Sequence, residues 1–273
     1  MLSVTATKTL LAVAAAGLIG SAAAASERLT AIEHLHHTVA AYAAPGVTLP
    51  DAAALTQRCA GDVLCAAEIV AAAFHSGARL EPVDHPESDS IRLVATMPSV
   101  GTVRRLSGGH VLVALGRVGR DAAQALRQSV VEAGARRLIL DLRANCGGGF
   151  ERMLRVASLF TGAVGEALWV DGGGARRAVD ISGGLPRLDL AALTVMVGPQ
   201  TASSAEFLAA LLRQYAGAAI AGQRTFGKDY LTRAIPVHHD WRLLIPAERI
   251  EVSGEVLVGG LVPDHPEPSV DLP

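Results

Sequence analysis

The sequence is poor in the features that usually accompany nucleic-acid binding. Aromatic residues make up 4% of its 273 residues, and the formal net charge is −2. Proteins that bind nucleic acid normally carry a clustered basic surface, and those that bind single strands add aromatic side chains on which bases stack. We therefore expect no nucleic-acid partner and no attraction to an acidic membrane surface. Because half of the residues are apolar, the chain can still bury a sizeable core.

Long apolar stretches are also missing, apart from one near the N-terminus. Lys8 precedes an apolar run over residues 10–20, and small residues fill 22–25 just before Ser26. This order is typical of a secretory signal peptide, so we expect cleavage after residue 25 and a periplasmic or secreted protein. The alternative is an uncleaved membrane anchor, for which the run is short, since a transmembrane helix needs about 20 apolar residues. Contact with a membrane is expected only in that second case.

Cysteine is scarce, with three residues in the whole chain. Cys59 and Cys65 lie in a segment that looks helical. Export would permit a disulfide between them, whereas two separate buried thiols are the alternative, and spacing alone does not decide. Cys146 lies in a glycine-rich loop, where we interpret it as a small loop residue and not as a nucleophile.

Composition divides the chain into five segments. An alanine-rich part looks helical, a part rich in proline and acidic residues indicates a linker or irregular strands, and the rest alternates strands with helices. The predicted segments are a signal peptide (1–25), a helical segment (26–77) in which Asp51 caps a helix, a linker with irregular strands (78–107), a main domain (108–268) and a tail (269–273).

The main domain is predicted to have an α/β fold with repeated crossovers, because apolar strands and amphipathic helices alternate along it. A hairpin follows near its end. The predicted strands are 110–115, 137–142, 193–197 and 218–221, the helices are 121–133, 150–160 and 204–215, and the hairpin strands are 231–237 and 241–246.

Ser203 lies at a turn from a strand into a helix, within the stretch VMVGPQTASSAE at 195–206. The free N–H groups and the dipole of a helix N-terminus favour negative charge there, which suits a nucleophile whose substrate develops an oxyanion. The alternative interpretation is a helix-capping serine, which is common wherever a helix begins.

Two further loops could belong to the same site. Lys228 follows Phe226 and Gly227 after a short strand, and a lysine that is partly desolvated loses its charge more easily and can act as a general base. An exposed hairpin lysine is the alternative. The stretch DLRANCGGG at 141–149 ends in three glycines, which let backbone N–H groups approach a ligand. A flexible connection is the alternative, and the pattern of a phosphate-binding loop is absent.

Together these stretches resemble the carboxyl-terminal processing peptidases, also called tail-specific proteases. The resemblance covers roughly residues 105–268. Four motifs carry it in the family's order: LILDLRANCGG at 138–148, TASSAE at 201–206, TFGK at 225–228 and GLVPD at 260–264.

The resemblance implies a crotonase/ClpP-like core of ββα units, preceded here by the N-terminal helical segment. It implies Ser203 as nucleophile, Lys228 as general base, and an oxyanion hole from backbone N–H groups of Gly147 (or Gly148) and Ser204. Thr232 stands where many members have a glutamine that orients the lysine, so it is the predicted third member. The family uses no metal and no cofactor. Its usual PDZ domain is not expected, because 26–107 is too short and too helical.

We therefore expect an exported serine endopeptidase that cleaves proteins or peptides through an acyl-enzyme intermediate, with an adaptor or a homo-oligomer as a further partner. One alternative is a non-catalytic protein that binds peptides or another ligand on the same scaffold, because fold does not fix function. A crotonase-like acyl-CoA enzyme is a poorer alternative, since an exported protein meets no CoA and the Ser203–Lys228 pair would go unexplained.

Overall fold

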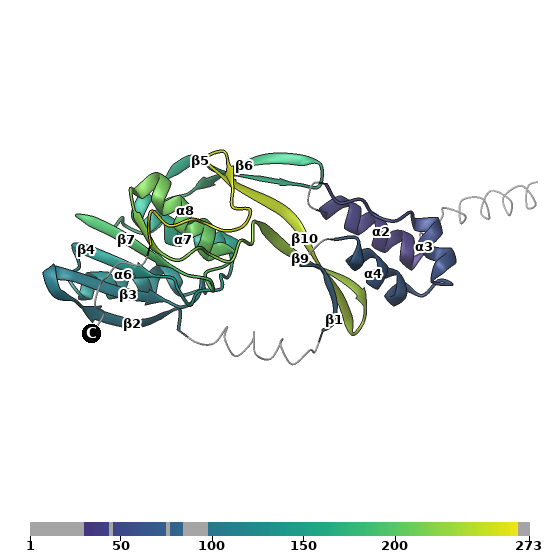
Figure 1. Cartoon of the computed structure of the whole chain (residues 1–273), viewed down its shortest axis with the longest axis horizontal. Coiled ribbons are helices and arrows are strands. Elements are labelled where there is room, and N and C mark those ends of the chain that lie inside the picture. The colour runs from purple at the N-terminus through teal and green to yellow at the C-terminus, as the bar shows by residue number, and fades with distance from the viewer. Residues whose placement is uncertain (1–29, 44–45, 75–76, 84–97, 267–273) are drawn as a thin grey trace, which may run out of the picture.

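The computed structural model describes residues 30–43, 46–74, 77–83 and 98–266. The predicted signal peptide and the predicted tail at 269–273 lie outside these residues. Figure 1 shows an elongated molecule, with helices of the N-terminal segment at one end, an α/β body at the other, and a long β-hairpin between them.

A mostly parallel sheet forms one layer of the body. Its strand order is β12-β8-β7-β4-β3-β2, and only β2 pairs antiparallel with its neighbour. Each predicted buried strand is present to within one residue at either end. The strands are β2 (Val100–Arg105), β3 (His110–Leu115), β4 (Arg137–Asp141), β7 (Ala192–Val197), β8 (Ala219–Gly222) and β12 (His265–Pro266).

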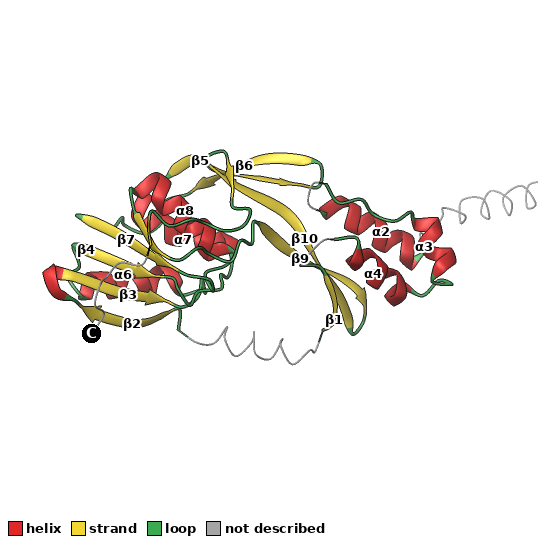
Figure 2. Cartoon of the chain, in the orientation of Figure 1, coloured by secondary structure: helices red, strands yellow, loops and turns green. Residues whose placement is uncertain are grey.

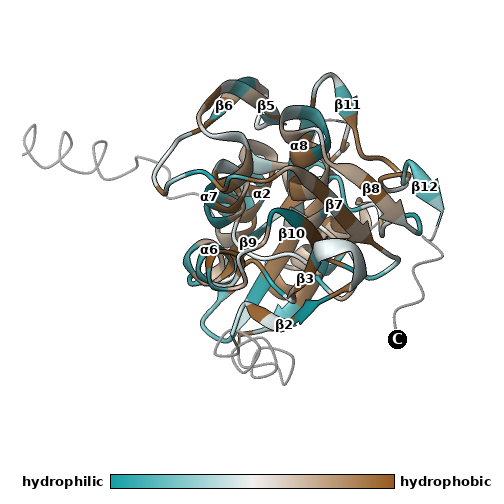
Figure 3. Ribbon diagram, turned by 90° about the vertical axis from the view of Figure 1, so that its left-hand side faces the viewer, coloured by the Kyte–Doolittle hydropathy of each residue, from teal (hydrophilic) through white to brown (hydrophobic). Residues whose placement is uncertain are grey.

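Three helices cover one face of this sheet, and all three were predicted. They are α6 (Ala122–Glu132), α7 (Phe150–Thr161) and α8 (Ser204–Ala216). Their apolar faces meet the strands in the larger hydrophobic core, and α7 and α8 lie between the two sheets of the molecule (Figure 2). The most apolar ribbon segments, such as β7, lie inside the body (Figure 3). The predicted α/β class is confirmed.

The second sheet contains strands that the sequence analysis did not anticipate. β5 and β6 form a hairpin around Gly173 and Gly174, both with positive φ, which a tight hairpin turn requires. The predicted hairpin is β9 and β10, but β10 continues six residues past the predicted end at 246. The strands are β1 (Arg79–Pro82), β5 (Val164–Gly172), β6 (Ala175–Ile181), β9 (Tyr230–His238), β10 (Trp241–Val252) and β11 (Glu255–Val256).

Strand β10 belongs to two separate hydrophobic cores. Ile250 and Val252, near its end, are buried in the core of the body. Leu243 and Ile245, nearer its start, are buried in a second core with the N-terminal helices. β1 pairs with this first half of β10 and β5 pairs with the end of the second half, whereas β9 pairs with β10 from Trp241 to Arg249. The hairpin therefore joins the two parts of the molecule through one continuous strand.

The N-terminal helices are capped by polar side chains. Thr30, Asp51 and Asp62 each accept hydrogen bonds from backbone N–H groups in the first turn of the helix that follows, as predicted for Asp51. The helices are α2 (Ala31–Tyr42), α3 (Ala52–Arg58) and α4 (Val63–Ala72). Within the described parts of the chain, every helix is too short or too polar to cross a bilayer.

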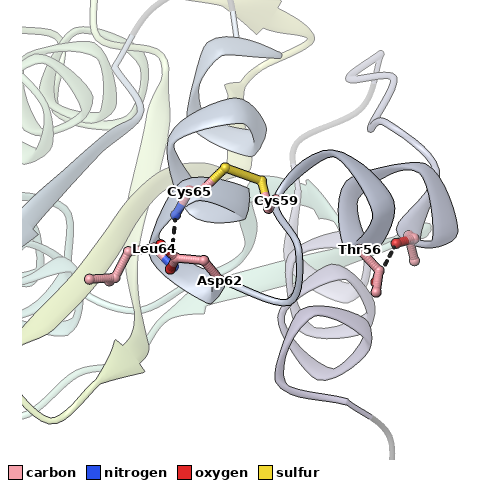
Figure 4. Close-up of a disulfide and its surroundings, with 6 residues drawn as sticks. Thr56, Cys59, Asp62, Leu64 and Cys65 are labelled. Carbon is pink, nitrogen blue, oxygen red and sulfur yellow. Dashed lines mark hydrogen bonds between the residues drawn. A yellow bond between two sulfur atoms is a disulfide. The ribbon is translucent and has the colours of Figure 1, made fainter.

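Cys59 and Cys65 form a disulfide that links the end of α3 to the first turn of α4 (Figure 4). Their spacing left two interpretations open, a disulfide or two separate buried thiols. The structure contains the disulfide. Asp62 lies between the two cysteines in sequence. Its backbone N–H donates to Cys59 O at 2.9 Å, and its carboxylate accepts from the N–H groups of Leu64 and Cys65. The turn between the helices is thus held by a covalent bond and a cap.

Candidate active site

Three loops meet where β4, β7 and β8 end. Parallel strands bring their carboxyl ends to the same edge of a sheet, which is the usual position of functional loops in such folds. After β4 comes the glycine-rich loop 142–149, after β7 the turn 198–203 that leads into α8, and after β8 the loop 223–229 with Lys228. The sequence motifs, which are far apart in the chain, therefore lie side by side in the structure.

The turn before α8 holds Ser203 in a strained backbone conformation. Its φ is +57° and its ψ is −128°, in a region that residues other than glycine rarely occupy. Thr201 fixes the turn, because its buried hydroxyl donates to Leu142 O at 2.8 Å and accepts from Gly198 N at 2.9 Å. Strain at a strand-to-helix turn that is held from both sides is the arrangement of a nucleophile elbow.

The glycine-rich loop packs directly against Ser203. A side chain at Gly147 would come within 3.0 Å of Ser203 Cβ and 2.9 Å of Ala202 O, so the position accepts only glycine without movement. Asn145, fully buried, holds the loop: its side chain donates to Leu115 O, and its backbone oxygen accepts from Ala202 N. The loop and the turn are thereby fixed relative to each other.

The backbone N–H groups near Ser203 differ in their availability. Gly147 N donates to Asn145 Oδ1 at 2.8 Å. The N–H groups of Gly148 and Ser204 have no partner within the described residues, and Ser204 Oγ donates to Gly148 O at 2.9 Å. Of the two glycines predicted for an oxyanion hole, Gly148 is therefore the one with a free donor.

A buried carboxylate joins the Ser203 turn to the Lys228 loop. Glu206, in the first turn of α8, is fully buried. Its Oε1 accepts from Thr225 Oγ1 at 2.5 Å and from Gly227 N at 2.7 Å. Its Oε2 accepts from Ser203 N at 2.7 Å and from Lys228 N at 2.9 Å. One oxygen atom thus holds the backbones of both predicted dyad residues.

The closing motif at 260–264 supports the Lys228 loop from behind. Leu261 N donates to Thr225 Oγ1 at 2.7 Å, and Thr225 N donates to Leu261 O at 3.2 Å. A side chain at Gly227 would come within 2.8 Å of Gly260 N. The closing motif, although about 35 residues downstream of Lys228, is therefore part of the support of the Lys228 loop.

The environment of Lys228 lowers the pKa of its side-chain amine. Burial lowers the pKa of its amine, and the positive charge of Arg79 lowers the pKa further, while the nearby Glu206 carboxylate and Cys146 act in the opposite direction. Nζ lies 5.4 Å from the centre of the Tyr230 ring. The net direction is downward, which makes the neutral amine accessible at a lower pH than for an exposed lysine.

Two predicted contacts are not formed among the described residues. No hydrogen bond joins Ser203 Oγ to Lys228 Nζ, although such bonds often tighten only when substrate binds. Thr232, the predicted third member, is exposed on β9 and its hydroxyl has no hydrogen bond to Lys228. The side chain that lies against Lys228 is that of Tyr230 instead.

Sequence reasoning used Glu206 only to locate the serine and assigned no role to Tyr230 or Arg79. Glu206 had a visible signal, since a glutamate three residues after a helix-capping position is a known helix-start pattern. Tyr230 and Arg79 had none, because their proximity to Lys228 depends on strand pairing. No group of three residues that could bind a metal ion occurs in the described ranges.

Comparison with curated proteins finds two peptidases among the relatives. The chain is 29% identical over 151 residues to carboxyl-terminal-processing peptidase 2, chloroplastic, of Arabidopsis thaliana, a match over 55% of this chain and 28% of that protein. It is 30% identical over 146 residues to the chloroplastic C-terminal processing peptidase of Tetradesmus obliquus, over 52% and 31%. The chain spans about a third of the length of the curated relatives it matches.

Solved structures share the fold. A photosystem II D1 C-terminal processing protease is similar with a TM-score of 0.53 and 23% identity, over 63% of this chain and 48% of that one. A lipoprotein from Streptococcus agalactiae is similar with a TM-score of 0.68 and 16% identity, over 88% of this chain and 91% of that one. The second match covers more of this chain than the α/β body alone.

A model of peptidase family S41 matches residues 108–264. That range is more than half of the chain and contains all four motifs, from LILDLRANCGG to GLVPD. The family resemblance drawn from the motifs is confirmed by this match. The chain belongs to peptidase family S41.

Proposed function

We propose that this protein is a serine endopeptidase in which Ser203 is the nucleophile and Lys228 the general base. One observation carries the proposal: Glu206 Oε2 accepts hydrogen bonds from the backbone N–H groups of both residues. A shared acceptor fixes the two backbones relative to each other, and fixed geometry is what a nucleophile–base pair requires.

In the proposed reaction, the neutral Lys228 amine takes the proton from Ser203 Oγ as this oxygen attacks a peptide carbonyl carbon. The resulting tetrahedral oxyanion accepts hydrogen bonds from the backbone N–H groups of Ser204 and Gly148, with Gly147 shaping the loop. Lys228 then gives the proton to the leaving amine, and the C–N bond breaks. Water, deprotonated by Lys228, finally hydrolyses the acyl-enzyme.

The lowered pKa of Lys228 supports this assignment. A general base must be neutral at the working pH, and an ordinary lysine is almost entirely protonated there. Burial and the positive charge of Arg79 both favour the neutral amine. Perturbed pKa values of this kind cluster at functional sites.

The test is digestion of casein, an unfolded protein substrate, by wild type and by two variants. We expect Ser203→Ala and Lys228→Ala each to reduce cleavage at least about 1,000-fold, as removal of a nucleophile or its base does. Ser129→Ala, which replaces a partly buried serine on α6, outside the three loops of the site, is the matched control and should cleave like wild type. Cleavage retained by either dyad variant, with a normal circular dichroism spectrum, would remove the assignment.

A second candidate is a protein that binds peptides on the same scaffold without cleaving them. The exposed position of Thr232, without a hydrogen bond to Lys228, favours it, because the lysine then lacks its predicted orienting group. Wild type that binds casein peptides but cleaves none, in equal measure with Ser203→Ala, would support this candidate over the peptidase.

We also propose that the protein is exported, with residues 1–25 removed as a signal peptide. The Cys59–Cys65 disulfide supports export, because such bonds persist mainly in oxidising compartments. N-terminal sequencing of the protein from the periplasmic or culture fraction should begin at Ser26. Full-length protein in the membrane fraction would instead support the anchor.

A further inference from the structure

The strands β9, β10 and β1 have one face turned away from the N-terminal helices. Leu80, Leu243 and Ile235 lie opposite one another on the three strands, and all three pack in the core with those helices. Residues directly paired across strands share a face, and neighbours in sequence lie on opposite faces. The adjacent row, Arg79, Leu244 and Ala234, is therefore on the other face.

This second face of β9, β10 and β1 extends to Lys228. Ala234 shares it with Thr232 and Tyr230, which are two and four positions earlier on β9. The Tyr230 ring is the group next to Lys228 Nζ. Thr232, Ala234 and Pro236 are all exposed on it, so the face is open to a bound chain. Arg79 therefore lies on an accessible surface that begins at the proposed general base.

Arg79 belongs to a charged cluster on this face. Its Nε donates to Glu81 Oε2 at 2.9 Å, and Arg242 Nε donates to Glu81 Oε1 at 2.8 Å. The Glu81 side chain is 8% exposed, whereas that of Arg79 is 53% exposed. Two arginines on one carboxylate leave the cluster with an excess of positive charge, and the exposed part of that charge is the Arg79 guanidinium.

The positive charge of Arg79 also acts on Lys228. Arg79 is close enough to Lys228 to lower the pKa of its amine. A second cation beside a desolvated amine is unfavourable for binding a basic group and favourable for binding an acidic one. In the described residues, the terminal nitrogens of Arg79 have no acceptor, so its guanidinium can still form a bidentate pair with a carboxylate.

We propose that Arg79 is a specificity-determining residue that binds a carboxylate of the peptide substrate, next to the dyad. The inference rests on the proposed peptidase function and narrows it to substrates with an acidic group near the scissile bond. That group is either an aspartate or glutamate side chain or the C-terminal carboxylate of the chain, since both offer the same planar acceptor.

The test separates binding from cleavage. Fluorescein-labelled seven-residue peptides of alanine and leucine carry either glutamate or glutamine at the centre, and end in either a free acid or an amide. Fluorescence anisotropy measures their binding to the Ser203→Ala variant. We expect one of the two carboxylates to improve affinity about tenfold, as a charge-assisted hydrogen bond does, and which one it is identifies the source.

The decisive comparison adds Arg79→Gln to Ser203→Ala, with Arg177→Gln as matched control. Arg177 is also paired with a glutamate, its side chain is 54% exposed, and it lies on β6, outside the strands that form the Arg79 face. Arg79→Gln should remove the difference between acid and neutral peptides, Arg177→Gln should preserve it, and Arg79→Lys should restore part of it.

Equal or undetectable binding of all four peptides would overturn the proposal, as would a difference that survives Arg79→Gln. A preference for the carboxylate that depends on Arg79, in a wild-type protein that cleaves none of the peptides and no casein, would leave this inference standing while the peptidase proposal fails. The two failures are therefore distinguishable.

Discussion

The loops at the dyad, toward one end of the molecule, and the first half of β10, toward the other end, are stabilised by different means. Near the dyad, three loops are joined by hydrogen bonds that converge on Glu206, Thr201 and Asn145, all fully buried. At the other end, the strand is held by apolar side chains such as Leu243 and Ile245. Hydrogen bonds are directional and fix positions of atoms, whereas hydrophobic burial holds elements together without fixing them closely.

This difference indicates a division of roles within one chain. The polar end sets the geometry of the proposed reaction, and the apolar end holds β1, and with it Arg79, at the side of Lys228. Substitutions in the hydrogen-bonded loops near the dyad should mainly reduce turnover. Substitutions in the apolar region around the first half of β10 should mainly reduce stability and alter substrate preference. Three experiments test this contrast.

The largest effect is expected from Glu206→Gln. All four partners of the Glu206 side chain are hydrogen-bond donors, two on each carboxylate oxygen. The glutamine amide keeps one oxygen but replaces the other by an NH₂ group. Two hydrogen bonds are then lost, and the NH₂ group lies against two other donors. We expect about 3 kcal/mol less stability to unfolding and roughly 100-fold slower casein cleavage. Urea denaturation and initial rates measure the two quantities.

Glu151→Gln is the control for that change. Glu151 is also a glutamate in the first turn of a helix, but it is exposed on α7. It should change neither rate nor stability by more than about 0.5 kcal/mol. If Glu206→Gln proved as active as wild type, the shared carboxylate would not be what positions the dyad.

Removal of the disulfide should have an intermediate effect, on stability alone. Replacing Cys59 and Cys65 by serine opens a short loop, which is expected to lower the free energy of unfolding by about 2 kcal/mol. Casein cleavage at 25 °C should change less than about twofold, because the bond lies in the N-terminal segment (Figure 4). Cys146→Ser, which replaces the free cysteine outside the disulfide, is the control for a cysteine-to-serine change. A large loss of turnover would show that the two ends are not separate in function.

The smallest effect is expected on the pH dependence. The neutral form of Lys228 increases as pH rises through its pKa, so kcat/KM should rise with pH and level off below the range of an ordinary lysine. Arg79→Gln removes a positive neighbour, raises the pKa of Lys228 and moves the rising limb to higher pH. An unmoved limb would mean that Arg79 acts on binding only.

The pKa itself can be measured directly. Lys228 is the only lysine after Lys8 in the sequence, so reductive ¹³C-methylation of protein that begins at Ser26 labels one side chain and the N-terminus. Titration followed by NMR should give a lysine signal with a pKa below that of free lysine, and higher in Arg79→Gln than in wild type.

Much of the body could be predicted from the sequence because its signals are local. Buried parallel strands appear as short apolar runs, and α6, α7 and α8 show the helical period, so their bounds were predicted to within one residue. The β5–β6 hairpin was missed although Gly173-Gly174 is a turn signal, since its strands carry charged residues such as Arg176 and Arg177 that hide the alternation.

The site could be predicted in part, for a related reason. Ser203, Lys228 and the glycine loop each carry a motif, and the structure brings those motifs together. The contacts that position them depend on residues far apart in sequence, such as Glu206 with Gly227 or Arg79 with the face of β9, and a single sequence gives no register for such pairs. The exposure of Thr232 likewise follows from the register of β9 and could not be deduced from its spacing to Lys228.

The backbone of Ser203 has a consequence for how such a chain evolves. A residue other than glycine at φ +57° and ψ −128° costs about 1–3 kcal/mol, and glycine adopts that conformation with little strain. Ser203→Gly should therefore be at once inactive and more stable than the wild type, whereas Ser203→Ala keeps the strain. Stability alone therefore favours glycine at this position, and only a use of the serine hydroxyl would offset the strain.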